Sequence, residues 1–155
     1  MHFPIIKLEA VETRPEDWDT SLNEEDSVLC ENTDYYGSIY SEEDRKNVIN
    51  SSWLWNFLRG IANLDVEKET ITFLDKDIVE KTIQDYLVER LDILKDRAVE
   101  GKLRLYELRS LATDFRDCST LFYYEYGMTS FDFVDEGRYM PNTTFRIGNI
   151  FDAHI

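Results

Sequence analysis

The sequence predicts a single α+β domain, spanning residues 1–155, in which an antiparallel sheet of short strands packs against about three helices. A length of 155 residues suits one hydrophobic core. Hydrophobic residues make up 43% of the chain and aromatic residues 14%, as in folded proteins. Strand-like and helix-like segments follow in the order strands, helix, strand, helices, strands, which is typical of the α+β class.

The first third of the chain predicts strands joined by acidic loops. Residues 3–9 alternate in hydrophobicity and predict a first strand. Residues 13–26 are rich in turn formers and predict a loop, in which Trp18 either packs into the domain or anchors an interface. The segments 27–31 and 35–40 predict two short strands of a hairpin.

A helix is predicted from Ser41, because Ser41 and Asp44 form a capping-box pattern. Ile49, Trp53 and Phe57 follow at four-residue steps, while other apolar residues cover the remaining faces as far as residue 61. A helix that is apolar nearly all round must be enclosed, either by its own domain or by another subunit.

The strongest helical pattern runs from Asp75 to Gly101, after a predicted strand at 69–74. An aspartate can cap its start, and Gly101 is placed to end it. Three- and four-residue steps draw one apolar stripe along it, which predicts a central core helix. The stripe consists of Val79, Ile83, Leu87, Leu91, Leu94 and Ala98.

The last third predicts one more helix followed by strands. Residues 102–115 carry a second helical pattern, which gives a helical pair with the central helix. Residues 118–126 and 143–151 are strand-like, and Phe131 and Phe133 alternate with Asp132 as in a further strand.

Charge is the most unusual property of the chain, whose formal net charge is −15. Residues 1–45 hold 13 acidic and 3 basic residues, so this acid-rich N-terminal third carries a net charge of −10. Such a field repels nucleic acid and anionic membranes, and it attracts a basic protein or a metal cation. The absence of a long apolar run and of a signal-peptide pattern predicts a soluble, cytoplasmic protein.

Catalytic and cofactor motifs are missing from the sequence. The two histidines, His2 and His154, stand at the chain ends, and the six glycines stand singly. Cys30 and Cys118 lack zinc-site spacing and predict reduced thiols, although the two could still pair. Acidic clusters at 24–26 and 132–136 lack the calcium-loop pattern. We therefore predict no catalytic residue, no metal site and no cofactor.

These observations predict a non-catalytic protein that occludes a basic site on a larger partner, such as a nucleic-acid-binding enzyme. DNA-mimic inhibitors of restriction and CRISPR enzymes, made by phages and mobile elements, are similar in composition, although no motif ties the chain to them. Direct nucleic-acid or membrane binding is not expected, and a homodimer stays open. The predicted partner-binding residues are Glu16, Asp17, Trp18, Asp19, Glu24, Glu25, Asp26, Glu31, Asp34, Glu42, Glu43 and Asp44.

Three alternatives remain beside this hypothesis. An immunity protein would neutralise a basic toxin nuclease by the same electrostatics. A small enzyme would use carboxylates, with or without a bound metal. An acidic scaffold or housekeeping protein would use its charge only for solubility.

Overall fold

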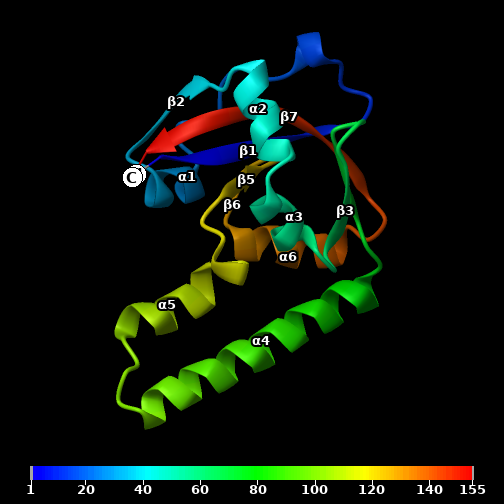
Figure 1. The fold of residues 1–155 in the computed structure, drawn as a ribbon. Helices are drawn as coiled ribbons and strands as arrows, with labels where there is room; N and C mark the ends of the chain where they lie inside the picture. Colours follow the sequence, from blue (N-terminus) through cyan, green and yellow to red (C-terminus); the bar gives the residue numbers. More distant parts are fainter. Residues whose placement is uncertain (1, 155) are drawn as a thin grey trace.

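The computed structural model describes residues 2–154, which form a mixed sheet of seven strands with helices on both faces (Figure 1). The strands are β1 His2–Ala10, β2 Tyr35–Ile39, β3 Ala62–Asp65, β4 Thr70–Phe73, β5 Leu121–Tyr123, β6 Gly127–Met128 and β7 Thr144–His154. The helices are α1 Ser27–Asn32, α2 Glu42–Ile49, α3 Ser52–Leu58, α4 Lys76–Val99, α5 Leu105–Thr113 and α6 Ser130–Tyr139, with short 3₁₀ turns η1 Pro15–Asp17 and η2 Phe115–Asp117.

The two longest strands, β1 and β7, form the centre of the sheet. The strand order is β3-β4-β7-β1-β5-β6, and β2 pairs with the free stretch of β7 beyond β4. The α+β class is confirmed, but the prediction of an antiparallel sheet with about three helices is inexact. The β1–β5 pair is parallel, because β5 arrives after a long crossover through α4 and α5 rather than through a hairpin.

Two hydrophobic clusters lie on opposite faces of the sheet, as the alternation of side chains along a strand requires. The larger cluster joins Ile6 and Leu8 of β1 to α3, α6 and the first half of α4. The smaller cluster joins Phe3 and Ile5 of the same strand to α1 and to Leu22 in the loop 11–26. The acid-rich N-terminal segment is therefore held against the sheet.

Two segments predicted as strands are helices. Residues 27–32 form α1, because the Asp26 side chain accepts a hydrogen bond from the Leu29 N–H and caps the helix. Residues 130–139 form α6, because Thr129 and Asp132 build a reciprocal capping box. The short Phe-Asp-Phe alternation suggested a strand, but it carries less weight than this helix-start signal.

The helix predicted from Ser41 is two helices. Asn50 lies outside the helical region, and Ser51 starts a second helix by accepting a hydrogen bond from the Leu54 N–H. The resulting change of direction buries the apolar residues of α3 against the sheet. Its Leu54, Phe57 and Leu58 are buried, so the domain itself encloses most of this segment.

The helix predicted from Asp75 to Gly101 is confirmed as α4, but the core burial of its whole stripe is wrong. Val79 and Ile83 are buried against the body, whereas Leu91 is 54% exposed. Ala98 is exposed as well. Figure 1 shows the reason, which is that α4 extends past the sheet and α5 folds back along its far half. No helix within residues 2–154 is long and apolar enough to cross a membrane.

Candidate partner-binding surface

The predicted acidic residues lie on η1, in the loop that follows it, on α1, just before β2 and on α2. In Figure 1, η1, β2 and α2 lie at the end of the molecule farthest from α4, and α1 lies along the side. Ten of the eleven predicted acids are exposed, which are Glu16, Asp17, Asp19, Glu24, Glu25, Glu31, Asp34, Glu42, Glu43 and Asp44. The fold therefore keeps nearly all of this charge in contact with solvent.

Four of these ten carboxylates have a Lys, Arg or His side chain within 4.0 Å, namely Glu16, Asp19, Asp34 and Glu42. Lys7 Nζ lies 3.0 Å from an Asp19 oxygen, and Lys46 Nζ lies 3.2 Å from a Glu42 oxygen. Within residues 2–154, no ion pair involves Asp17, Glu24, Glu25, Glu31 or Glu43. These groups remain available to cations from outside the chain.

Asp26 differs from the other acids because it points into the protein. One of its oxygens caps α1 through the Leu29 N–H at 3.0 Å, and the other accepts a hydrogen bond from the Gly127 N–H at 3.0 Å. The carboxylate thus joins α1 to β6, about a hundred residues later in the chain. Its role in the fold is structural, and its oxygens are already occupied.

Arg45 of α2 holds the acidic segment to the sheet. Its guanidinium is buried in the gap that β4 and β2 leave along β7, where it donates hydrogen bonds to the carbonyls of Ile147 and Gly148. It also lies 2.7 Å from a Glu69 oxygen and 5.0 Å from the centre of the Trp18 ring. One buried cation therefore fixes both α2 and the loop that carries η1.

Trp18 packs into this arrangement rather than standing free. Its ring lies over the Arg45 guanidinium, and the side chain is only partly exposed. Asn149 of β7 donates a hydrogen bond to the carbonyl of the adjacent Asp19 at 2.9 Å. Of the two roles weighed for Trp18, the geometry favours packing into the domain.

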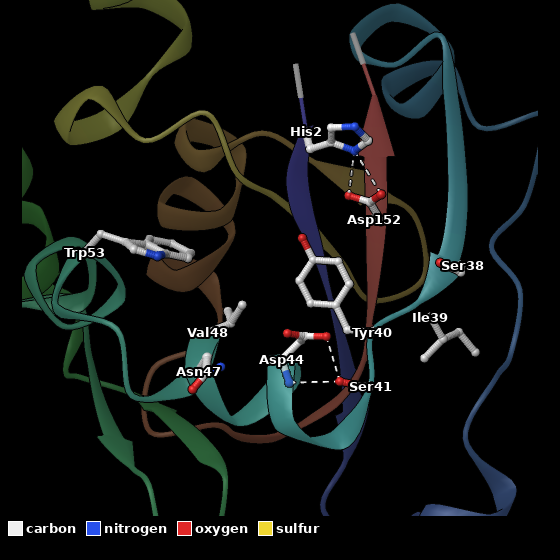
Figure 2. Close-up of a pocket in the computed structure, with 10 residues that line it drawn as sticks. All are labelled: His2, Ser38, Ile39, Tyr40, Ser41, Asp44, Asn47, Val48, Trp53 and Asp152. Atoms are coloured by element: carbon white, nitrogen blue, oxygen red, sulfur yellow. Dashed lines mark hydrogen bonds and ion pairs between the residues drawn. The ribbon is translucent and has the colours of Figure 1, made fainter.

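A hollow of about 590 Å³ opens beside α2, and Figure 2 shows the side chains that line it. Asp44 comes from α2, Trp53 from α3, and His2 and Asp152 from the paired ends of β1 and β7. The Tyr40 ring stands between the His2–Asp152 pair and Asp44 (Figure 2). Two carboxylates and two aromatic rings thus surround one cavity.

The charges in this hollow are oriented by short contacts. His2 Nδ1 lies 2.9 and 3.1 Å from the two Asp152 oxygens. The Ser41 hydroxyl donates to an Asp44 oxygen at 2.6 Å and accepts a hydrogen bond from the Asp44 N–H. The pKa of Tyr40 is raised by burial first and then by the Asp152 and Asp44 carboxylates. Burial is the larger cause of this pKa shift, and the two carboxylates add to it.

The His2–Asp152 pair resembles two thirds of a catalytic triad, but the arrangement lacks a nucleophile. In a triad, a serine or cysteine is hydrogen-bonded to the histidine. Among residues 2–154, His2 forms hydrogen bonds from its ring to Asp152 alone, and the Ser41 hydroxyl is engaged with Asp44. Within the described residues, the pair therefore has no hydroxyl or thiol bonded to the histidine, as acyl transfer by a triad would require.

Within residues 2–154, no group of three or more His, Cys, Asp and Glu side chains is arranged to hold a metal ion. Cys30 is exposed and Cys118 is half-buried, and the two thiols are not joined in the structure. Burial raises the pKa of Cys118, which keeps this thiol protonated and weakly nucleophilic.

Comparisons with protein-family models, with curated proteins and with solved structures find no match to this chain. The geometry and charge of the chain itself therefore carry the information on its function. The sequence located the acids of residues 16–44, but it missed the hollow, because His2 and Asp152 are 150 residues apart. Only a prediction that strands β1 and β7 pair with each other could have suggested that these two residues meet.

Proposed function

We propose that this protein is a non-catalytic acidic binding protein that occludes a basic, nucleic-acid-binding site on a larger partner in the cytoplasm. The observation that carries the proposal is the outward display of ten predicted acids on one end and side of the molecule. Carboxylates can take the place of phosphates, because both accept charge-assisted hydrogen bonds from Lys and Arg. Defence nucleases and toxin nucleases alike hold nucleic acid through such residues.

Rigidity of the acidic surface supports the proposal. Arg45 ties α2 and the η1 loop to β7, and Asp26 ties α1 to β6. A surface whose charges are fixed before binding loses less conformational entropy when a partner docks. The negative potential is then available for long-range attraction of a basic partner and for fast association.

The hollow beside α2 provides a second contact of defined chemistry. Asp44 offers a carboxylate with one oxygen bound by Ser41, Asp152 offers a second that is shared with His2, and Tyr40 and Trp53 offer aromatic faces in the same cavity. A guanidinium or ammonium group is favoured by both, through charge and through cation–π contact. We propose that one Lys or Arg side chain of the partner enters here.

Affinity capture from a host lysate, followed by identification of the captured protein, supplies the partner for the test. Binding of that purified partner is then measured by calorimetry between about 50 and 200 mM salt, with and without competing DNA. The proposal predicts that affinity falls steeply with salt and that DNA competes. Binding that is indifferent to both salt and DNA would contradict it.

Two charge-matched triple variants separate the acidic surface from net charge alone. The first changes Asp17→Asn, Glu24→Gln and Glu25→Gln on the acidic surface. The control removes the same charge from exposed positions on α4. Its substitutions are Glu89→Gln, Asp92→Asn and Asp96→Asn. We expect the first to weaken binding about tenfold, because each exposed ion pair contributes roughly 0.2 to 1 kcal/mol. Equal losses in both variants would refute a localised binding surface.

A further inference from the structure

The far half of α4 and the whole of α5 form a two-helix arm, residues 87–113, that leaves the sheet behind (Figure 1). The helices run antiparallel and are held by polar contacts along the seam. Arg97 Nε lies 2.6 Å from a Glu107 oxygen, and Arg90 reaches the Ser110 hydroxyl at 3.5 Å. Leu94 fills the seam and is only 4% exposed.

One side of this arm is apolar and uncovered. On α4, Leu91 and Ala98 line up beside the seam as exposed residues, in continuation of Leu87, which packs partly against the main cluster. On α5, three- and four-residue steps align Leu105, Leu108 and Ala112, and the antiparallel course places this row on the same side of the hairpin as the α4 row. Leu91 is 54% and Leu105 is 85% exposed, so the face is in contact with water in the single chain.

Charge sets the arm apart from the rest of the protein. Residues 76–113, from the start of α4 to the end of α5, contain eight acidic and eight basic residues and are together neutral, and the arm within them contains five acidic and six basic residues. The whole net charge of −15 therefore belongs to the remaining residues. Like-charge repulsion, which keeps copies of an acidic protein apart, is weakest at this arm.

We propose that the apolar face of the α4–α5 arm binds the same face of a second copy of this chain. A basic partner is drawn to the acidic residues at 16–44 instead, and a nucleic acid or anionic membrane is repelled by the whole chain. Two copies that meet through their arms keep the acid-rich ends of α2 and η1 apart (Figure 1). The contact is isologous, because one surface meets its own copy about a two-fold axis.

The size of the face sets the expected strength. From Leu87 to Val99, α4 rises roughly 18 Å, and each helix is about 10 Å wide. A standard interface buries about 800 Å² per partner. The nine residues of α5 are shorter still, so the face is smaller than that of a standard interface and the dimer is expected to be weak and reversible. The proposed dimer does not depend on the proposed function, although a dimer would display two acidic surfaces at once.

Sedimentation equilibrium of the free protein tests the proposal across a wide concentration range, about 1 to 300 μM. The expected result is a mass that rises from the 18.4 kDa of one chain toward twice that value. A protein that stays at the mass of one chain throughout would overturn the proposal. Because no partner is present, this outcome is independent of the test of acidic-surface binding.

Substitutions locate the face if the protein dimerises. Leu91→Glu and Leu105→Glu each place a charge on the face and are expected to raise the dimer dissociation constant about tenfold or more. Both positions are exposed in the single chain, so folding is retained and is checked by circular dichroism. The matched control is Ile93→Glu, an exposed position on the opposite side of α4, which is expected to leave the dissociation constant unchanged. Dimerisation that survives both Leu91→Glu and Leu105→Glu would overturn the assignment of the face.

Discussion

Replacing Arg45 by Met should destabilise the protein strongly, because this buried cation contacts two carbonyls, two carboxylates and the Trp18 ring. The change leaves the Ile147 and Gly148 carbonyls without their donor. It also leaves the Glu69 carboxylate, which is only 24% exposed, without the cation 2.7 Å away. Breaking a buried pair by removing one partner typically costs about 3 to 5 kcal/mol. We expect a loss in the free energy of unfolding within that range.

The assay is urea unfolding at neutral pH, with Lys46→Met as the matched control. Lys46 is the next residue of α2, but its side chain is 59% exposed and its ion pair with Glu42 is a surface pair. Such a pair contributes at most about 1 kcal/mol. Hydrogen exchange should also show that residues 11–26 lose protection in Arg45→Met, since Trp18 loses the guanidinium on which it packs. A loss below about 1 kcal/mol, or one equal to the control, would refute the reasoning.

Three further predictions concern the core and one buried acid. Ile83→Ala should lower the free energy of unfolding by about 2 to 5 kcal/mol, because Ile83 is buried. Leu91→Ala, in the half-exposed part of the same stripe, should lower it by less than about 1 kcal/mol in the monomer. Urea unfolding at low protein concentration compares the two variants. Gly137→Ala should lower the melting temperature, because a Cβ there would lie 2.4 Å from the Phe73 ring. Burial raises the pKa of Glu9 above its ordinary value of 4.5. The native state therefore binds the Glu9 proton more tightly than the unfolded chain does. The stability that this proton contributes is lost as the pH rises through the pKa of the folded state. Glu9→Gln should therefore gain more stability at pH 7 than at pH 4, and equal effects at both values would contradict this explanation.

Local patterns in the sequence predicted the long elements well. The strands at 3–9, 69–74 and 143–151 and the helix from Asp75 to Gly101 are all present, because their periodicity extends over enough residues to be distinctive. The short segments 27–31 and 131–133 were assigned wrongly. For residues 130–139, the capping box of Thr129 and Asp132 was the available signal. For α1, the Asp26 cap was readable, but the bond from Asp26 to Gly127 was not.

The stripe on α4 shows why periodicity could not decide burial. Val79, Leu91 and Leu94 share one pattern. Val79 lies in the main core, Leu91 is exposed, and Leu94 fills the seam with α5. Periodicity states only which residues share a side of a helix. Whether that side is covered depends on how far the helix extends past the sheet, which is set by packing elsewhere.

By itself, the sequence determined the net charge of −15, its concentration in residues 1–45 and the lack of catalytic motifs, because charge and composition simply add along the chain. The tertiary structure decided which of those charged groups face the solvent and which are buried or paired. Asp26 faces inward, Arg45 is buried against β7, and His2 meets Asp152 only because β1 pairs with β7. The apolar face of the arm is likewise exposed only because α4 is longer than the body that it packs against. These outcomes depend on contacts between residues far apart in the chain, which local patterns do not encode.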